Sequence, residues 1–200
     1  MPRIKFDDID KFFTYHIFPS TKTMFLGSPD STEDGGAIGV NHTLVEKVAI
    51  GLHVLDNIKL EQPINIIMNC IGGDEYEGLA IYDEIKRCSS DVRMRVTGHC
   101  MSMGVWILQA ADKRILSPNS RMMVHVGSMG LGVNHPENNK AWMAQYCKDE
   151  AIFEDILLKR IREVHPLYTR QEVKDLIRFD KILMPQEAVD LGLADEIEEV

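Results

Sequence analysis

Two apolar segments, each followed by a glycine-containing turn and a helical pattern, constrain the fold of this chain most strongly. Residues 64–69 form a short apolar run rich in β-branched side chains, which is typical of a buried parallel strand. Residues 92–96 alternate apolar and charged side chains, the period of a strand with one solvent-facing side. Because strand and helix alternate through most of the sequence, we expect an α/β fold with a largely parallel sheet.

Periodicity and turn chemistry predict the other elements. Further strands are expected at residues 24–26, 113–116 and 121–124, and helices are expected to begin near residues 41, 74, 105, 134, 169 and 185. The helix from about residue 134 to 164 is long for a domain of this size, so part of its apolar face is expected to meet another subunit. Residues 27–39 are predicted to be a loop, and the acidic residues 195–199 a solvated end.

The length and composition predict one globular domain. The chain has 200 residues, enough for a single core, and we divide it into an irregular N-terminal arm at 1–22 and one domain at 23–200. Aromatic residues in the arm are expected to pack on the body or on a neighbouring subunit. The formal net charge of -9 argues against a nucleic-acid partner.

No apolar run is long enough to span a bilayer, and the first residues do not resemble a signal peptide. Four widely spaced cysteines suggest neither a disulfide framework nor a zinc site, which favours a cytoplasmic protein with reduced thiols. The histidines lack the spacing of metal ligands, so we predict no metal and no cofactor.

The stretch GHCMSMG at 98–104 places Ser102 where a strand is followed by a buried helix. A hydroxyl there can be exposed at a sheet edge beside the free N–H groups of the helix N-terminus, as in hydrolases that carry a nucleophilic serine on such a turn. The alternative is that Ser102 only caps the helix.

Other residues at element ends complete the requirements of acyl transfer. His125 follows a predicted strand and is a candidate base, although a histidine in that position is often only a core or interface group. The N–H of Met103 and that of Gly73, in a glycine-glycine turn, are candidate donors to an oxyanion.

Several motifs together resemble the proteolytic subunit of the ATP-dependent Clp protease. They are MNCIGG at 68–73 with GLAIYD at 78–83, the serine motif at 98–104, MMVH at 122–125, and Asp180 followed by EAV at 187–189 and GLAD at 192–195. The resemblance extends from about residue 23 to the end of the chain, and the order and spacing of the motifs match.

The resemblance implies a catalytic triad of Ser102, His125 and Asp180, with Gly73 and Met103 forming the oxyanion hole. Asp175 lies near enough in sequence to compete with Asp180 for the third role. The substrate would bind as an added strand near Gly72 and the segment Val126, Gly127 and Ser128.

The resemblance also implies a crotonase-like fold of repeated strand-strand-helix units, in which the long helix interdigitates between stacked rings. The expected assembly is a homo-oligomer of two heptameric rings, a tetradecamer, that encloses the active sites and cleaves peptides or unfolded proteins. An AAA+ unfoldase is a possible partner, but Asn65 and Ile67 replace the tyrosines that often form its docking cleft.

Two alternatives stay open, one from departures from the family pattern and one from the related crotonase fold, which shares the paired oxyanion amides. Cys70-Ile71 replaces the usual Ser-Pro, larger residues precede Ser102, and the Gln-Pro that usually follows the histidine is absent. A divergent, non-catalytic ring subunit that partners an active paralogue is therefore one alternative. An acyl-CoA enzyme of the crotonase fold is the other, although no basic cluster for the CoA phosphates is present.

Overall fold

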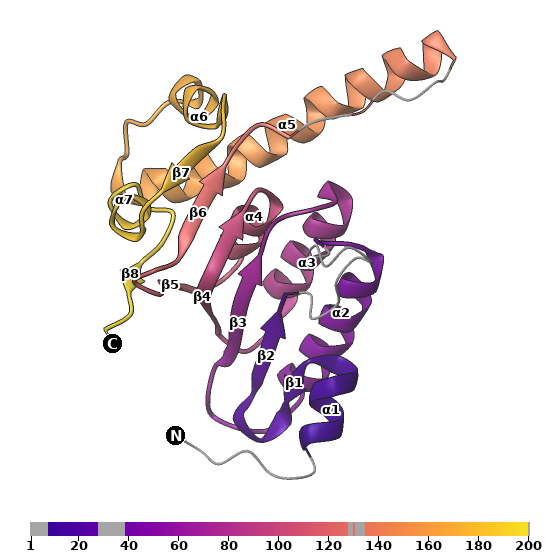
Figure 1. Cartoon of the computed structure of the whole chain (residues 1–200), viewed down its shortest axis with the longest axis vertical. Coiled ribbons are helices and arrows are strands. Elements are labelled where there is room, and N and C mark those ends of the chain that lie inside the picture. Colours follow the sequence, from indigo (N-terminus) through magenta and orange to yellow (C-terminus); the bar gives the residue numbers. More distant parts are fainter. Residues whose placement is uncertain (1–7, 28–38, 128–129, 131–134, 200) are drawn as a thin grey trace.

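The computed structural model describes residues 8–27, 39–127, 130 and 135–199. Helices and strands alternate along these ranges (Figure 1). The helices are α1 (Asp8–Tyr15), α2 (His42–Asp56), α3 (Glu75–Arg87), α4 (Met103–Leu108), α5 (Pro136–Val164), α6 (Arg170–Ile177) and α7 (Pro185–Asp190), with a 3₁₀ turn at Pro19–Thr21. The strands are β1 (Ile17–Phe18), β2 (Thr23–Leu26), β3 (Ile64–Cys70), β4 (Val92–Met101), β5 (Lys113–Leu116), β6 (Arg121–Val124), β7 (Lys181–Leu183) and β8 (Glu196–Ile197). The predicted loop at 27–39 lies almost wholly outside the described residues.

One sheet contains all the strands of the described ranges. Its order is β1-β2-β3-β4-β5-β8, and β6 and β7 branch from β4. Pairing is parallel from β2 to β5 and between β5 and β8, whereas β1–β2 and β6–β7 are antiparallel. The first half of β4 pairs with β5 and its second half with β6, both in parallel. The expected α/β fold with a largely parallel sheet is confirmed.

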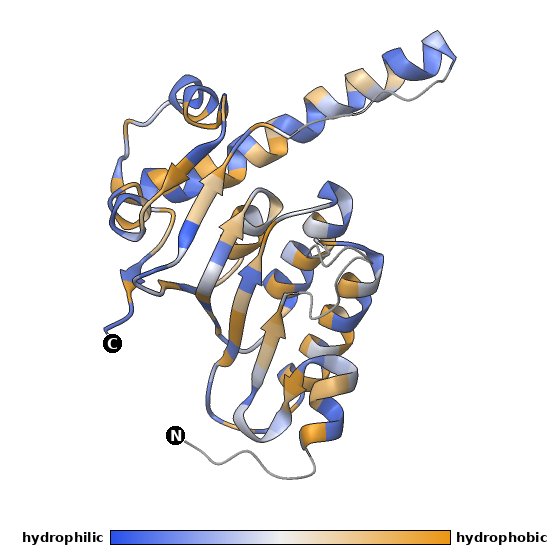
Figure 2. Cartoon of the chain, in the orientation of Figure 1, coloured by the Kyte–Doolittle hydropathy of each residue, from blue (hydrophilic) through white to orange (hydrophobic). Residues whose placement is uncertain are grey.

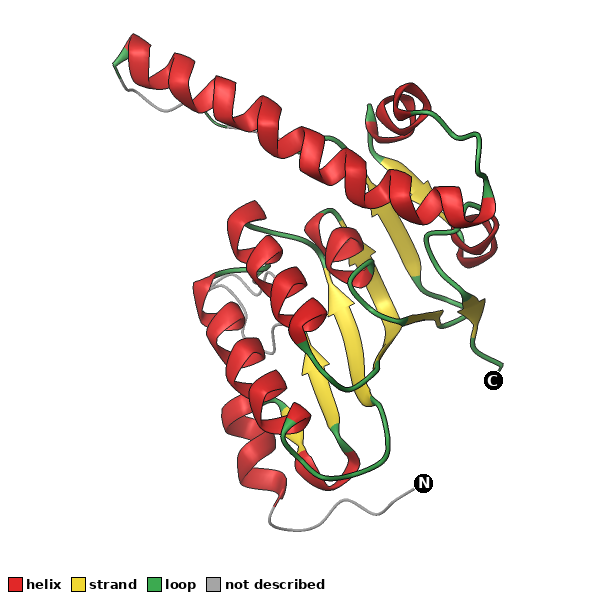
Figure 3. Ribbon diagram, turned by 180° about the vertical axis from the view of Figure 1, so that it is seen from behind, coloured by secondary structure: helices red, strands yellow, loops and turns green. Residues whose placement is uncertain are grey.

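Helices α2, α3 and α4 cover one face of the central strands, as the view from behind shows (Figure 3). The side chains of β3 alternate, with Ile64, Ile66 and Met68 buried against these helices. Strands β2 and β3 are coloured largely as hydrophobic, whereas β4 alternates hydrophobic and charged residues (Figure 2). This burial, rather than intrinsic helix propensity, stabilises the layer of helices.

A side-chain cap precedes two of the three helices in this layer, α2 and α3. The Asn41 side chain accepts a hydrogen bond from the N–H of Leu44 at 2.9 Å, as the sequence predicts for α2. Asp74, near which the sequence predicts a helix to begin, immediately precedes α3, and its side chain accepts a hydrogen bond from the N–H of Glu77 at 3.0 Å. Each cap satisfies an N–H that the helix itself leaves unpaired.

The N-terminal segment differs from the expected irregular arm. Residues 8–15 form α1, and β1 pairs with β2. Phe12 stacks on Phe18 with the ring centroids 4.6 Å apart and meets Phe25 edge-on at 5.4 Å. The helix is therefore held by tertiary packing of aromatic rings on β1 and β2, which has no periodic signature in the sequence.

Strand β4 is longer than predicted, because it continues through Gly98 to Met101. The Asn69 side chain of β3 accepts a hydrogen bond from the N–H of His99 at 2.8 Å. A Cβ on Gly98 would lie only 2.7 Å from the same oxygen. Gly98 thus allows a close approach between strands, rather than the tight turn that the sequence suggested.

The long helix predicted near residues 134–164 is present as α5. Its first half extends away from the rest of the molecule (Figure 1). Its buried residues begin only at Asp149, while Trp142 and Met143 are about half exposed, at 52% and 44%. Within the described ranges, no helix combines the length and hydropathy needed to cross a bilayer.

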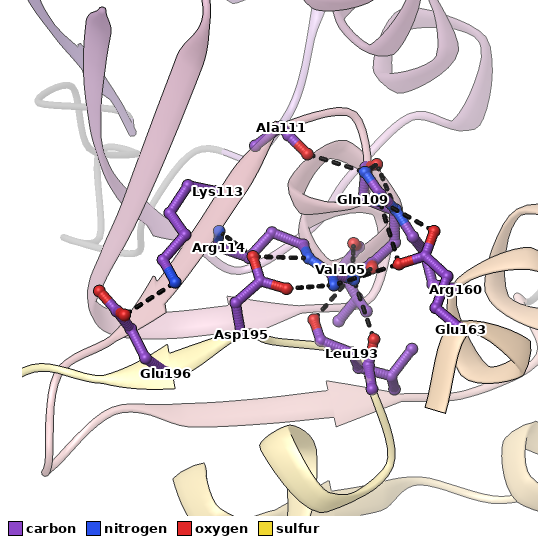
Figure 4. A network of polar contacts seen from close by, with 11 residues as sticks. Val105, Gln109, Ala111, Lys113, Arg114, Arg160, Glu163, Leu193, Asp195 and Glu196 are labelled. Atoms are coloured by element: carbon purple, nitrogen blue, oxygen red, sulfur yellow. Dashed lines mark hydrogen bonds and ion pairs between the residues drawn. The ribbon is translucent and has the colours of Figure 1, made fainter. Parts of the chain in front are cut away.

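The acidic C-terminal residues are not a solvated end, so that expectation was wrong. Strand β8 pairs with β5, and the Arg114 side chain donates to the carboxylate of Asp195 at 2.5 Å. Arg114 also donates to Gln109 Oε1 at 2.7 Å and to the carbonyl of Gly192 at 2.9 Å (Figure 4). These contacts stabilise the C-terminal segment against the sheet.

Replacing Arg114 with leucine is expected to lower the free energy of unfolding by about 3 kcal/mol, because three buried or half-buried acceptors lose their donor. Urea denaturation at neutral pH measures this loss. Hydrogen bonds from Arg114 hold the pKa of Asp195 below its usual value although burial opposes them. The contribution of the pair is therefore present at neutral pH and is lost as the pH falls through that lowered pKa, so the difference should shrink in acid.

Lys113→Ala is the matched control, since it removes the adjacent, half-exposed ion pair with Glu196. Such a pair contributes less than about 1 kcal/mol. Equal losses of stability in the two variants would contradict a structural role for the buried network.

Candidate active site

Ser102 lies between β4 and α4 in a strained backbone conformation. Its φ of 49° and ψ of -129° are unusual for a residue other than glycine, and they cost about 1–3 kcal/mol. The Ser102 N–H donates to the carbonyl of Met123 at 2.8 Å, which ties the turn to β6. The side chain makes no capping hydrogen bond to α4, so the capping-only alternative does not describe its contacts.

His125 follows β6 directly and faces the serine. Because β4 and β6 are parallel, with Met101 opposite Met123, the residues that follow the two strands lie side by side. His125 Nε2 lies 2.8 Å from Ser102 Oγ, within hydrogen-bond distance. The imidazole therefore contacts the hydroxyl instead of serving as an isolated core group.

Asp180 completes a hydrogen-bonded series. It precedes β7, whose antiparallel pairing with β6 sets Val124 opposite Lys181. Asp180 Oδ1 lies 3.1 Å from His125 Nδ1, and its side chain is 74% exposed. The competitor Asp175 instead accepts from Gln171 within α6, at 3.2 Å.

A glycine turn lies against the serine. Gly72 and Gly73 have φ values of 95° and 146°, which side chains rarely adopt. A Cβ on Gly72 would lie 2.5 Å from the Cβ of Ser102 and 3.1 Å from the nitrogen of Met103. Among the described residues, the N–H groups of Gly73 and Met103 have no hydrogen-bond acceptor, so both can donate to a bound group.

Some of the backbone groups predicted to bind substrate already form hydrogen bonds within the protein. The Gly72 carbonyl accepts from the N–H of Val40 at 2.7 Å, and the Val126 N–H donates to the carbonyl of Ile177 at 2.5 Å. The Gly127 carbonyl accepts from the hydroxyl of Tyr146 at 2.6 Å. Ser128 lies outside the described residues. The substrate-binding role of this segment stays a prediction.

A cavity of about 500 Å³ adjoins the serine and the histidine. Its walls come from the glycine turn, the first turn of α3, the segment after β6, and α5. The lining side chains that the sequence did not single out as site residues are Asp74, Glu75, Tyr76, Trp106, Trp142, Tyr146, Asp149, Glu150, Phe153 and Ile177. Helical periodicity marks most of these only as one face of a helix, and nothing in the sequence brings α3 and α5 together.

The cavity is electrostatically negative. Burial raises the pKa of the Glu75 carboxyl, and the nearby carboxylates of Asp149, Asp74 and Glu150 raise it further. Burial, with Glu150 and Glu75 nearby, raises the pKa of Tyr146 to about 12, so its hydroxyl remains a neutral donor. Within the described ranges, the cavity included, no group of three potential ligands could hold a metal ion, and all four cysteines are free thiols.

The fold and the site define a class of protein. Serine, histidine and an acid in a hydrogen-bonded series, with two N–H groups beside the serine, form the arrangement with which serine hydrolases transfer acyl groups. The protein is thus an α/β protein with a serine-hydrolase type of site.

The comparisons with known proteins identify the family. Residues 37–200 match the sequence model of the Clp protease family. An ATP-dependent Clp protease proteolytic subunit from Deinococcus radiodurans is 32% identical over 178 residues, which cover 88% of this chain and 79% of that protein. A solved structure of a ClpP1 mutant from Listeria monocytogenes superposes with a TM-score of 0.74 at 25% identity, covering 91% of this chain and 94% of that one.

The chain belongs to the Clp protease family. The predicted family and its crotonase-like fold are confirmed, and membership supports a peptidase role.

Gly72→Ala is expected to lower the free energy of unfolding by about 1–3 kcal/mol, because the new Cβ must displace Ser102 and the backbone must keep a positive φ. Thermal or urea denaturation measures this loss. The control is Gly130→Ala at an exposed position, where no described residue lies within 4 Å of an added Cβ, and it should be nearly neutral. A Gly72→Ala protein as stable as the control would contradict the close approach of the turn to the serine.

Proposed function

We propose that this protein is a serine endopeptidase that hydrolyses peptides or unfolded proteins. The observation that carries the proposal is the series of hydrogen bonds from Ser102 through His125 to Asp180, at 2.8 and 3.1 Å. Family membership supports the same conclusion from the sequence.

The geometry supports a two-step mechanism. With the Nδ1–H of His125 donating a hydrogen bond to the carboxylate of Asp180, the Nε2 of His125 is free to remove the proton of Ser102 Oγ as that oxygen attacks the peptide carbonyl. The oxyanion of the tetrahedral intermediate is held by the N–H groups of Gly73 and Met103. His125 then protonates the leaving amine, and a water molecule, deprotonated by the same nitrogen, hydrolyses the acyl-enzyme.

The exposure of Asp180 fits an orienting role. A carboxylate that is 74% exposed in the protomer is well hydrated and contributes little stability as an ion pair. Its hydrogen bond at Nδ1 selects the tautomer and the ring orientation that the mechanism needs. We therefore assign it orientation of the base, and Asp175 no part in the reaction.

We propose further that the protein acts as a homo-oligomer of stacked heptameric rings. The support is the protruding half of α5, where Trp142 and Met143 remain half exposed in the protomer. Apolar side chains on a helix that extends from the body are best buried against another subunit. We also propose that residues 23–200 act as one domain and that the protein works in the cytoplasm without nucleic acid or membrane.

An AAA+ unfoldase is the partner that this function implies. A second cavity of about 500 Å³ is lined by apolar side chains, among them Phe12, Phe25 and Ile67, together with the polar side chains of His16, Lys47, Asn69 and Thr97. A largely apolar cavity with a few polar groups suits an apolar segment of a partner. Ile67 is one of the two positions at which the family often has a tyrosine.

Ser102→Ala is expected to abolish labelling by a fluorophosphonate probe and to reduce peptide turnover by several orders of magnitude, because the nucleophile is lost. Mass spectrometry of the labelled peptide and a fluorogenic peptide assay measure the two effects.

Asp180→Asn is expected to lower kcat roughly 10²–10⁴-fold, because the amide no longer selects the tautomer of His125 that leaves Nε2 free to accept the serine proton. The same fluorogenic peptide assay measures this loss.

Asp175→Asn is the matched control and should retain full activity. If wild-type rings are well folded but neither react with the probe nor cleave peptides alone, and do so only with a second subunit, the non-catalytic alternative replaces this proposal.

The assembly has its own test. Native mass spectrometry is expected to give a mass of fourteen or seven copies of the 22.7 kDa chain. A monomer at micromolar concentration would contradict the ring and leave the exposed side chains of α5 unexplained.

A further inference from the structure

Four carboxylates line the cavity beside Ser102. Asp74 and Glu75 come from the start of α3, and Asp149 and Glu150 come from the middle of α5. Among the described residues that line this cavity there is no lysine or arginine. A substrate side chain that enters the cavity therefore meets a negative field close to the reacting bond.

Two of these four carboxylates, Asp149 and Asp74, already accept hydrogen bonds within the protein. Asp149, only 7% exposed, accepts from the Tyr76 hydroxyl at 3.0 Å and from the Gln145 side chain at 2.8 Å. Asp74 caps α3 by accepting from the N–H of Glu77. These hydrogen bonds fix Asp149 and Asp74 in the walls of the cavity.

Glu75 differs, because no described residue donates a hydrogen bond to it or forms an ion pair with it. Its side chain reaches across the cavity, and a Cβ on Gly127 would lie 2.3 Å from its Oε1. Gly127 is two residues after His125, so the carboxylate lies close to the base. Burial and the neighbouring carboxylates raise the pKa of this carboxyl although His125 opposes them, and a bound cation would reverse that effect.

The other walls suit the stem of a long cationic side chain. Trp142 and Tyr146 of α5 line the cavity together with the buried rings of Trp106 and Phe153. The methylene groups of lysine or arginine pack well on such rings, while the charged end seeks an acceptor. Tyr146 is held in place by its hydrogen bond to the Gly127 carbonyl.

We propose that this cavity selects substrates with arginine or lysine at the residue whose carbonyl Ser102 attacks, and that Glu75 is the carboxylate that binds the cation. The inference rests on the proposed peptidase function and adds the substrate class. A guanidinium fits best, because its planar fork pairs with a carboxylate through two hydrogen bonds.

The test compares short fluorogenic peptides that differ only in arginine, lysine, leucine or methionine before the scissile bond. We expect kcat/KM of the assembled wild-type protein to be at least about tenfold higher for arginine than for leucine. Glu75→Gln should reduce this ratio at least about tenfold, since a neutral amide cannot pair with the cation.

Asp83→Asn is the matched control. It removes the same charge from the same helix, but Asp83 is exposed and does not line the cavity. The arginine-to-leucine ratio of this variant should equal that of the wild type. A ratio that falls equally in both variants would mean that net charge, not Glu75, attracts the substrate, and would overturn the proposal.

A second measurement separates this inference from the proposed catalysis. Isothermal titration of Ser102→Ala with arginine and norleucine peptides reports binding without turnover, and the arginine peptide should bind at least about tenfold more tightly. Equal affinities would overturn the specificity, whether or not the wild-type protein is active. Failure of the fluorophosphonate to label wild-type Ser102, with the binding preference intact, would instead overturn only the peptidase function.

Discussion

The parallel pairing of β4 with two different partners is the constraint on which the rest of the structure depends. The first half of this strand pairs with β5 and the second half with β6, so the sheet branches at its centre. The branch sets the end of β4 beside the end of β6, and therefore Ser102 beside His125. The antiparallel return of β7 then brings Asp180 to the same edge.

The strained backbone conformation of Ser102 is stabilised by contacts with β6 and the glycine turn. The positive φ of Ser102 persists because its N–H is bonded to β6 and its Cβ lies against the backbone of Gly72. The same close approach brings the free N–H groups of Gly73 and Met103 near the hydroxyl. Packing of the glycine turn thus orders the nucleophile and the proposed oxyanion donors together, before any substrate binds.

Much of the fold and part of the candidate site followed from sequence patterns. Apolar runs and caps located most strands and helices, and the residues Ser102 and His125 stood out because each follows a strand. The walls of the cavity did not follow from such patterns, since Glu75 belongs to no motif of the sequence analysis and lies in the first turn of α3 like any acidic residue that favours a helix start. The segment 195–199 appeared solvated because its acidic composition hides the pairing of Asp195 with Arg114, 81 residues away.

The sequence by itself determined the alternation of elements, the parallel sheet and the motifs of the family, because periodicity and turn chemistry are local properties of the chain. Only the tertiary structure decided that Asp180 rather than Asp175 contacts the histidine, that residues 8–15 are helical, and that α3 and α5 enclose one acidic cavity. These features arise from contacts between residues distant along the chain. A local pattern carries no information about such pairs, since their geometry is set by how strands and helices pack.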